Sequence, residues 1–137
     1  MSVDREALES VVELVGWESP SRTDVIEQRH VDAFSSAIGR RATSGRIPPT
    51  FYASFLTDPP PLPGIEDIEC RWLNGGDTFE FEQTVRVGDS LTSCTRLADV
   101  TIKDRPQGPI ALVTMTTDFF LDIGTVAVRH SGVRVML

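Results

Sequence analysis

The chain has 137 residues and a formal net charge of −7, with 40% hydrophobic and 24% charged residues. This size suits one domain with a real core, and the charge excludes a general binder of nucleic acids or anionic membranes, which need a basic surface. The sequence has no apolar run of membrane-spanning length and no signal peptide at its start, so we expect a cytoplasmic protein with one domain over residues 1–137.

The first third of the sequence carries two amphipathic helical patterns. Apolar residues recur at helical spacing between Asp4, a good N-cap, and Gly16, which suits a helix end. After a short β-prone segment at 23–27, a second apolar stripe predicts a helix at about 30–38.

The stretch at 47–56 is apolar on most sides and predicts a short helix at about 48–57. The two prolines near its start suit a first helical turn, where an N–H group has no intrahelical partner. Phe51 and Phe55 lie four residues apart and therefore share one row of the helix. Such a helix must be covered by other elements, and the segments that follow can cover it.

The second half of the chain changes to the period of β-strands. Apolar and polar residues alternate over 78–87 and again over 111–121, a long strand-like segment occupies 91–103, and Gly88–Asp89 is a turn signal. Helices followed by long antiparallel strands indicate an α+β chain. Because a curved sheet needs its concave face filled, we predict a single hot-dog fold, a curved antiparallel sheet wrapped around the helix at 48–57. A generic α+β sandwich is the alternative.

The last strand changes phase along its length. Its apolar residues occupy even positions at Val126 and Val128 but odd positions from Val133 onward. Because neighbouring strand residues face opposite sides of a sheet, this change predicts a β-bulge or a sharp bend between His130 and Gly132.

Several pieces of the sequence, taken in order, match a known pattern. They are Val31-x-x-Phe34-x-x-Ala37-Ile38-Gly39, Ile47-Pro48-Pro49-Thr50-Phe51, Gly75-Gly76-Asp77-Thr78-Phe79-Glu80-Phe81, Val85-Arg86-Val87-Gly88-Asp89-Ser90-Leu91, Ala98-Asp99-Val100-x-x-Lys103 and Gly108-Pro109-Ile110-Ala111-Leu112-Val113-Thr114. From about residue 23 to the C-terminus, the chain resembles the N-terminal, FAS1-like dehydratase half of MaoC-type hydratases. It is similar to the first halves of mesaconyl-CoA or methylfumaryl-CoA hydratases and to non-catalytic subunits of mycobacterial hydroxyacyl dehydratases.

The resemblance implies a hot-dog domain that acts on acyl thioesters of coenzyme A or acyl carrier protein, with no further cofactor and no metal. The implied reaction is reversible addition of water across a 2-enoyl thioester. That chemistry needs an acid/base pair and N–H groups that polarise the thioester carbonyl. In catalytic family members the pair lies in a Gly-Asp-x-Asn-Pro-x-His motif just after the helix that ends in Ala-Ile-Gly.

This sequence departs from that motif. Gly39 is followed by Arg40-Arg41-Ala42-Thr43, and the loop is too short to hold the motif before Ile47. A guanidinium stays protonated and cannot act as a general base. We therefore predict no catalytic residue in this chain, which would be the non-catalytic, acyl-binding subunit of a heteromeric (R)-specific enoyl-thioester hydratase or 3-hydroxyacyl dehydratase (a hydro-lyase). A catalytic MaoC-like hot-dog partner, in a heterodimer or heterotetramer, would supply the Asp/His pair.

Two other functions stay open. The first is a homodimeric hot-dog thioesterase or hydratase with atypical catalytic residues, and the second is a stand-alone acyl-CoA-binding protein. A carboxylate on the central helix would favour the first, and residues 47–56 contain none.

The candidate substrate-binding residues follow from the implied acyl tunnel. We predict that the tunnel is lined by residues from the central helix and from the segment before the glycine pair, namely Pro49, Phe51, Tyr52, Phe55, Trp72 and Asn74. The arginines of the polar loop, Arg40, Arg41 and Arg46, could hold the phosphates of coenzyme A or form a solvated basic loop.

The remaining polar candidates have simpler explanations. We expect structural roles for His30 and for His130, because the sequence places no carboxylate at a matching spacing from His130. Asp77 and Asp89 are explained by turn chemistry. The two cysteines, Cys70 and Cys94, form no ligand pattern and are expected as buried thiols on strands.

Overall fold

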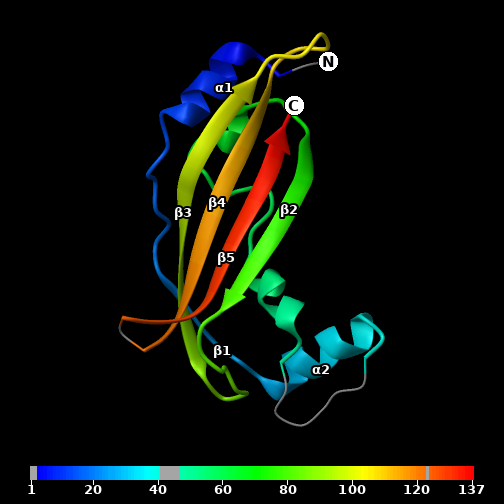
Figure 1. Ribbon diagram of the computed structural model, residues 1–137, viewed down its shortest axis with the longest axis vertical. Helices are drawn as coiled ribbons and strands as arrows, with labels where there is room; N and C mark the ends of the chain where they lie inside the picture. The colour runs from blue at the N-terminus through cyan, green and yellow to red at the C-terminus, as the bar shows by residue number, and fades with distance from the viewer. Residues whose placement is uncertain (1–2, 41–46, 123) are drawn as a thin grey trace.

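The computed structural model describes residues 3–40, 47–122 and 124–137 (Figure 1). The elements in chain order are α1 (Arg5–Val12), β1 (Arg22–Val25), α2 (Gln28–Ala37), the 3-10 helices η1 (Pro49–Phe55) and η2 (Ile65–Asp67), β2 (Trp72–Phe81), β3 (Ser90–Lys103), β4 (Ile110–Asp122) and β5 (Thr125–Met136). None of the helices in these ranges is long and apolar enough to cross a membrane.

The strands form one antiparallel sheet in the order β1-β3-β4-β5-β2. The long strands curve together, with α1 beside β3 at the end where the chain termini lie and α2 beyond the opposite end (Figure 1). The helix η1 packs on the inward face of the sheet, where the rings of Tyr52 and Phe55 lie 5.8 Å and 6.1 Å from that of Phe119. The predicted α+β arrangement of a curved antiparallel sheet and a central helix is confirmed.

The central helix is shorter and tighter than the sequence indicated. It spans Pro49–Phe55 rather than 48–57 and is a 3-10 helix. The Phe51 N–H donates to the Pro48 carbonyl at 2.9 Å, and the Leu56 N–H donates to that of Ala53 at 3.1 Å, both with 3-10 spacing. The proline-rich connector over residues 58–64 cannot continue the helix, so no room is left for further α-helical turns.

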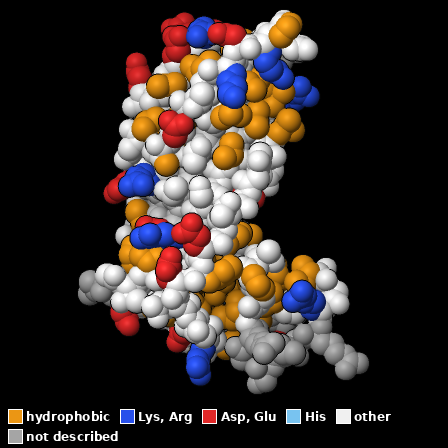
Figure 2. Space-filling view, in the orientation of Figure 1, with side chains coloured by type: hydrophobic (Ala, Val, Ile, Leu, Met, Phe, Trp, Pro, Cys, Tyr) orange, Lys and Arg blue, Asp and Glu red, His pale blue; other side chains and the backbone are white. Residues whose placement is uncertain are grey.

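The buried apolar side chains form two clusters on the inward face of the sheet. One lies towards α1 and includes Leu8, Val11, Leu62, Leu97, Val113 and Met136. The other lies towards η1 and α2 and includes Ile26, Val31, Phe51, Tyr52, Leu91, Phe119 and Val128. On the face drawn in Figure 2, exposed hydrophobic side chains gather near the upper and lower ends, with mostly other side chains and backbone between them.

The last strand does not change phase after Val128, and the predicted bulge between His130 and Gly132 is wrong. Every even residue from 128 to 136 is buried, and the β4–β5 register is continuous over this range. The extra residue is Ala127, which has no partner between the pairs made by Val126 and Val128. The apparent change of phase arose because the inward positions after Val128 hold polar residues and a glycine instead of apolar side chains.

The strand predicted at 78–87 is also displaced. β2 begins at Trp72 and ends at Phe81, and an irregularity at Gly75 shifts its register against β5. Val85 is buried without belonging to a strand. The turn at Gly88–Asp89 is as predicted, because Gly88 has φ 97° and the Asp89 carboxylate accepts the Arg86 N–H at 2.8 Å.

Candidate functional site

A polar row crosses the inward face of the sheet between the two apolar clusters. Thr95 pairs with Thr117 across β3 and β4, and Thr117 pairs with His130 across β4 and β5. The hydroxyl oxygens of the two threonines lie 2.8 Å apart. Thr117 is 3% exposed and His130 is 4% exposed, so both side chains need partners inside the protein.

His130 is paired with a carboxylate. Its Nε2 lies 2.7 Å from Oδ1 of Asp77, a residue of β2. This corrects two expectations, since Asp77 lies within a strand rather than at a turn and His130 is accompanied by a carboxylate. The two residues are 53 positions apart in the chain, and only the pairing of β2 with β5 brings them together.

Arg134 completes the network from the inward position of β5 that follows Gly132. Its Nε donates to Asp58 Oδ1 and its Nη2 donates to Asp77 Oδ1, both at 2.9 Å. Its Nη1 donates to the Asn74 side-chain oxygen and to the Val133 carbonyl, both at 3.2 Å. Arg134 is only 7% exposed, so the guanidinium acts as a buried clamp between the sheet and the connector that holds Asp58.

The network sets the charge states of its members. Burial opposes ionisation of Asp77, but hydrogen bonds from His130, Asn74 and Arg134 outweigh burial and lower the pKa of this carboxyl. Burial likewise opposes the charge of Arg134, and the bonds to Asp58 and Asp77 overcome it and raise the pKa of the guanidinium. An ionised Asp77 and a charged Arg134 therefore stand beside the imidazole.

The contact with Asp77 also fixes the imidazole tautomer. A carboxylate accepts hydrogen bonds, so Nε2 carries the proton that faces it. The Phe79 ring packs on the imidazole with the ring centroids 4.9 Å apart. Nδ1 is buried and has no hydrogen-bond partner among the described residues.

A cavity of about 50 Å³ lies between the sheet and the segment that leads from η1 into the connector. The sheet side contributes Thr117, His130 and Arg134, and the opposite side contributes Phe55, Leu56 and Pro60. This volume accommodates a small functional group or ordered water, but not a long acyl chain.

The structure distributes the predicted substrate-binding residues over several environments. Phe55 lines the cavity, and Asn74 reaches the network behind it through Asp77 at 3.1 Å. Phe51 and Tyr52 are buried in the core, where burial and then the Asp89 charge raise the pKa of Tyr52 to about 12. Pro49 is exposed, and Trp72 packs against the other cluster. The substrate-binding roles of these residues remain predictions.

The other candidates lie away from the cavity. Arg40 is exposed, and Arg41 and Arg46 lie outside the described residues. His30 is exposed on α2. Both cysteines are free and half-buried, although only Cys94 lies on a strand, and burial raises the pKa of the Cys70 thiol. The described part of the chain gathers no three side chains that could hold a metal ion.

Comparison with protein families identifies the chain. The model of the FAS1-like dehydratase domain region matches residues 13–129, nearly the whole fold. The chain belongs to this family. A comparison with curated proteins gave no match.

Solved structures similar to this FAS1-like dehydratase domain share its fold at low sequence identity. The ChsH1–ChsH2 complex of Mycobacterium tuberculosis has a TM-score of 0.71 and 14% identity, covering 96% of this chain and 89% of that chain. A C-terminally truncated HadBC (3R-hydroxyacyl-ACP dehydratase) complex of the same organism has a TM-score of 0.67 and 16% identity, covering 90% of this chain and 97% of that chain. A MaoC-like dehydratase of Rhodospirillum rubrum has a TM-score of 0.60 and 20% identity, covering 90% of this chain and 91% of that chain. The domain therefore has the hot-dog fold of MaoC-like dehydratases.

The polar network of this FAS1-like dehydratase domain was not predicted from the sequence. A signal for it was present, because the inward positions of β5 read His130, Gly132 and Arg134 between Val128 and Met136. Polar residues in the middle of an inward row indicate an internal polar site, and the partners that complete the site come from distant segments.

Proposed function

We propose that this chain is the non-catalytic, acyl-binding subunit of a heteromeric (R)-specific enoyl-thioester hydratase or 3-hydroxyacyl dehydratase. The observation that carries the proposal is the segment after α2, where Gly39 is followed by two arginines and no Asp or His occurs before Ile47. A guanidinium cannot take a proton from water at any useful pH. The acid/base pair then comes from a partner hot-dog subunit.

The free edge of the sheet supports the existence of a partner. Within the described residues β2 is an edge strand paired with β5 alone, and its Leu73 and Phe81 side chains are 56% and 52% exposed. A long edge with unpaired backbone groups and exposed apolar side chains favours association with another sheet. Two of the similar structures are complexes, ChsH1–ChsH2 and HadBC, which is consistent with this arrangement.

The apolar helix η1 supports the acyl-binding role. Its sequence from Pro49 to Phe55 carries no charge, and Phe55 is only half-buried beside the cavity. In this proposal Phe55 forms part of the tunnel wall. The carrier is coenzyme A or an acyl carrier protein, and the exposed Arg40 is available for its phosphates.

The His130–Asp77 pair favours a second candidate, a hydratase that carries its own atypical acid/base pair. Asp77 orients the ring through Nε2, and Nδ1 would take or give the proton. The ring is only 4% exposed and its Nδ1 atom is buried, which opposes direct contact between this nitrogen and a substrate.

Hydration assays distinguish the two candidates and also the stand-alone binding protein. Crotonyl-CoA and longer 2-enoyl-CoA thioesters are incubated with the purified chain, with a partner that carries the Gly-Asp-x-Asn-Pro-x-His motif, and with both. We expect no turnover by this chain alone and the highest turnover by the complex. Turnover by the chain alone that is lost in His130→Ala but kept in the exposed His30→Ala would establish the second candidate. If the chain binds acyl-CoA but does not change the turnover of any partner, the stand-alone acyl-CoA-binding protein is the remaining candidate.

A further inference from the structure

The edge strand β2 carries a charge at the middle of its inward face. Its inward-facing side chains run from Trp72 through Asn74 and Asp77 to Phe79 and Phe81. Of these only Asp77 is charged, and it lies next to the midpoint of the strand. Among the described residues β2 is the last strand of the sheet on its side (Figure 1). A second sheet that joins this edge therefore meets Asp77 near the centre of the contact.

A second carboxylate, that of Asp58, lies beside Asp77. Nη2 of Arg134 donates to Asp77 Oδ1 at 2.9 Å and to Asp58 Oδ2 at 3.5 Å, so one guanidinium serves two carboxylates. The Arg134 side chain is buried, whereas those of Asp58 and Asp77 are 59% and 26% exposed. Because the positive charge lies inside and the two negative charges lie nearer the surface, the group presents negative charge to a molecule at the β2 edge.

Next to this charge the same edge offers apolar surface. The rings of Phe79 and Phe81 stack with their centroids 6.4 Å apart, and Phe81 also lies 5.9 Å from the ring of Tyr52. Phe81 is nevertheless 52% exposed. Exposed aromatic rings supply contact area to an interface, and a charged group beside them supplies selectivity between partners. The β2 edge has both.

A second copy of the same chain fits this edge poorly. Antiparallel pairing of two whole β2 strands places the two-fold axis at the strand midpoint, between Gly76 and Asp77. The Asp77 carboxylates of the two copies then lie at neighbouring positions, where like charges destabilise a strand pair. The lowered pKa of Asp77 keeps the carboxyl ionised at neutral pH, so protonation does not relieve this repulsion.

We propose that Asp77 makes the β2 edge selective for a partner sheet that presents a cationic side chain, arginine or lysine, opposite it, and that the same charge opposes pairing of this chain with itself. The inference rests on the heteromeric function proposed above and names the chemistry of the partner. The partner's edge strand carries apolar side chains that meet Phe79 and Phe81, and one cationic residue near its middle. The cation pairs with Asp77 and offsets the excess negative charge around Arg134.

The first test needs no partner protein. Sedimentation equilibrium measures the self-association of the unmodified chain, of Asp77→Asn and of Glu80→Gln. Glu80 is exposed on the outward face of β2, and two-fold pairing keeps the two copies of this residue at opposite ends of the contact, so Glu80→Gln is a control for the loss of one charge. We expect Asp77→Asn to self-associate about fivefold more tightly than the unmodified chain, and Glu80→Gln to differ by less than about twofold. Equal constants for the two variants overturn the proposal.

The second test identifies the cation. Calorimetry measures binding of the chain to a partner that carries the Gly-Asp-x-Asn-Pro-x-His motif, with each arginine and lysine of the partner's edge strand replaced in turn by glutamine. We expect Asp77→Asn to weaken binding about tenfold or more, and one replacement in the partner to weaken it equally, with little further loss when the two are combined. Glu80→Gln should bind normally. The proposal fails if no cationic residue of that strand couples to Asp77.

The outcomes separate the edge charge from the proposed function. If Asp77→Asn self-associates more tightly and no motif-bearing partner binds the chain, the charge at the edge stands and the heteromeric function fails. If a partner binds the unmodified chain and Asp77→Asn equally well, the heteromeric function stands and the selectivity fails. If Asp77→Asn does not fold, salt decides with the unmodified chain. Between about 50 mM and about 500 mM NaCl, partner binding should weaken and self-association should tighten, because salt screens attraction and repulsion alike. A change in the same direction for both overturns the proposal.

Discussion

Gly132 lies directly opposite Asp77 in the β2–β5 ladder, and its missing side chain makes room for the hydrogen bond between Asp77 and His130. A Cβ atom at Gly132 would lie 2.8 Å from Asp77 Oδ1 and 2.8 Å from the Cε1 atom of His130. Real side chains do not approach so closely, so the polar network requires glycine at this position.

Gly132→Ala should therefore destabilise the fold. The added methyl group must push the Asp77 carboxylate from His130, which leaves buried polar groups unpaired at a cost of about 1–3 kcal/mol. Urea denaturation measures the free energy of unfolding. Ser131→Ala, next to it on the opposite face, is the control and should change this free energy by less than about 0.5 kcal/mol. Equal stability of Gly132→Ala and the unmodified chain would contradict the packing argument.

Acid should weaken the fold partly through Asp77. Its pKa is lowered in the folded state, so the unfolded chain binds more protons between the folded pKa and the ordinary value near 3.8. The contribution of the ionised Asp77 to the free energy of unfolding is fully present above the ordinary pKa of the carboxyl. It is lost as the pH falls through the lowered pKa of the folded state. Free energies of unfolding measured from pH 6 downwards should fall more steeply below pH 4 in the unmodified chain than in Asp77→Asn.

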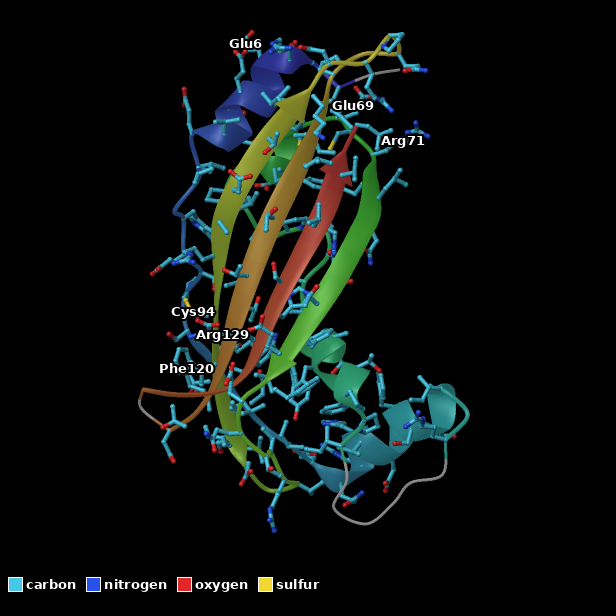
Figure 3. The ribbon with its side chains drawn as sticks, viewed as in Figure 1. Glu6, Glu69, Arg71, Cys94, Phe120 and Arg129 are labelled. Atoms are coloured by element: carbon cyan, nitrogen blue, oxygen red, sulfur yellow. The ribbon has the colours of Figure 1, made fainter. Side chains whose placement is uncertain are left out.

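Asp118→Asn is the matched control for that titration. Asp118 pairs with Arg129 at 3.3 Å, and both side chains are largely exposed, so this bridge contributes only about 0–1 kcal/mol. Figure 3 shows Arg129 on β5, towards the same end of the sheet as Phe120. An Asp118→Asn curve that differs from the unmodified chain as much as the Asp77→Asn curve would show that the effect is not specific to the network.

Phe55→Trp should change the acyl-chain preference of the complex. A larger ring at the cavity wall shortens the space for the acyl tail, and each methylene excluded from an apolar pocket is worth about 1–3 kcal/mol, or 10- to 200-fold in kcat/KM. The profile of kcat/KM against chain length should shift to shorter 2-enoyl-CoA substrates. Phe120→Trp, on the opposite face of β4, should leave the profile unchanged. An identical profile in Phe55→Trp would remove this residue from the tunnel.

Leu73→Lys should weaken association with the partner subunit. Leu73 is 56% exposed on the edge strand β2, and a lysine on an edge strand opposes strand addition. We expect the dissociation constant to rise about tenfold or more, which corresponds to about 1.4 kcal/mol, as measured by sedimentation of labelled chain with partner. Val12→Lys, an exposed apolar position on α1, is the control and should associate normally. Unchanged association of Leu73→Lys would place the interface elsewhere.

Local sequence patterns determined most of the elements. Asp4 caps α1 as expected and accepts the Glu6 N–H, because an N-cap depends on neighbouring residues only. The strand β4 follows its alternation for the same reason, whereas β3 has a register shift at Ala98. The errors occurred at β2 and β5, where bulges at Gly75 and Ala127 shift the register and alternation alone cannot locate them.

The sequence by itself determined an α+β hot-dog chain that lacks the family's acid/base motif. Only the tertiary structure decided that Asp77 accompanies His130 and that Asp58, 76 positions away, accompanies Arg134. Periodicity reports which face of an element is apolar, but a buried polar residue is stable only beside partners, and those partners are selected by strand register and chain topology. The site beside His130 therefore became visible only once β2, β5 and the connector lay together.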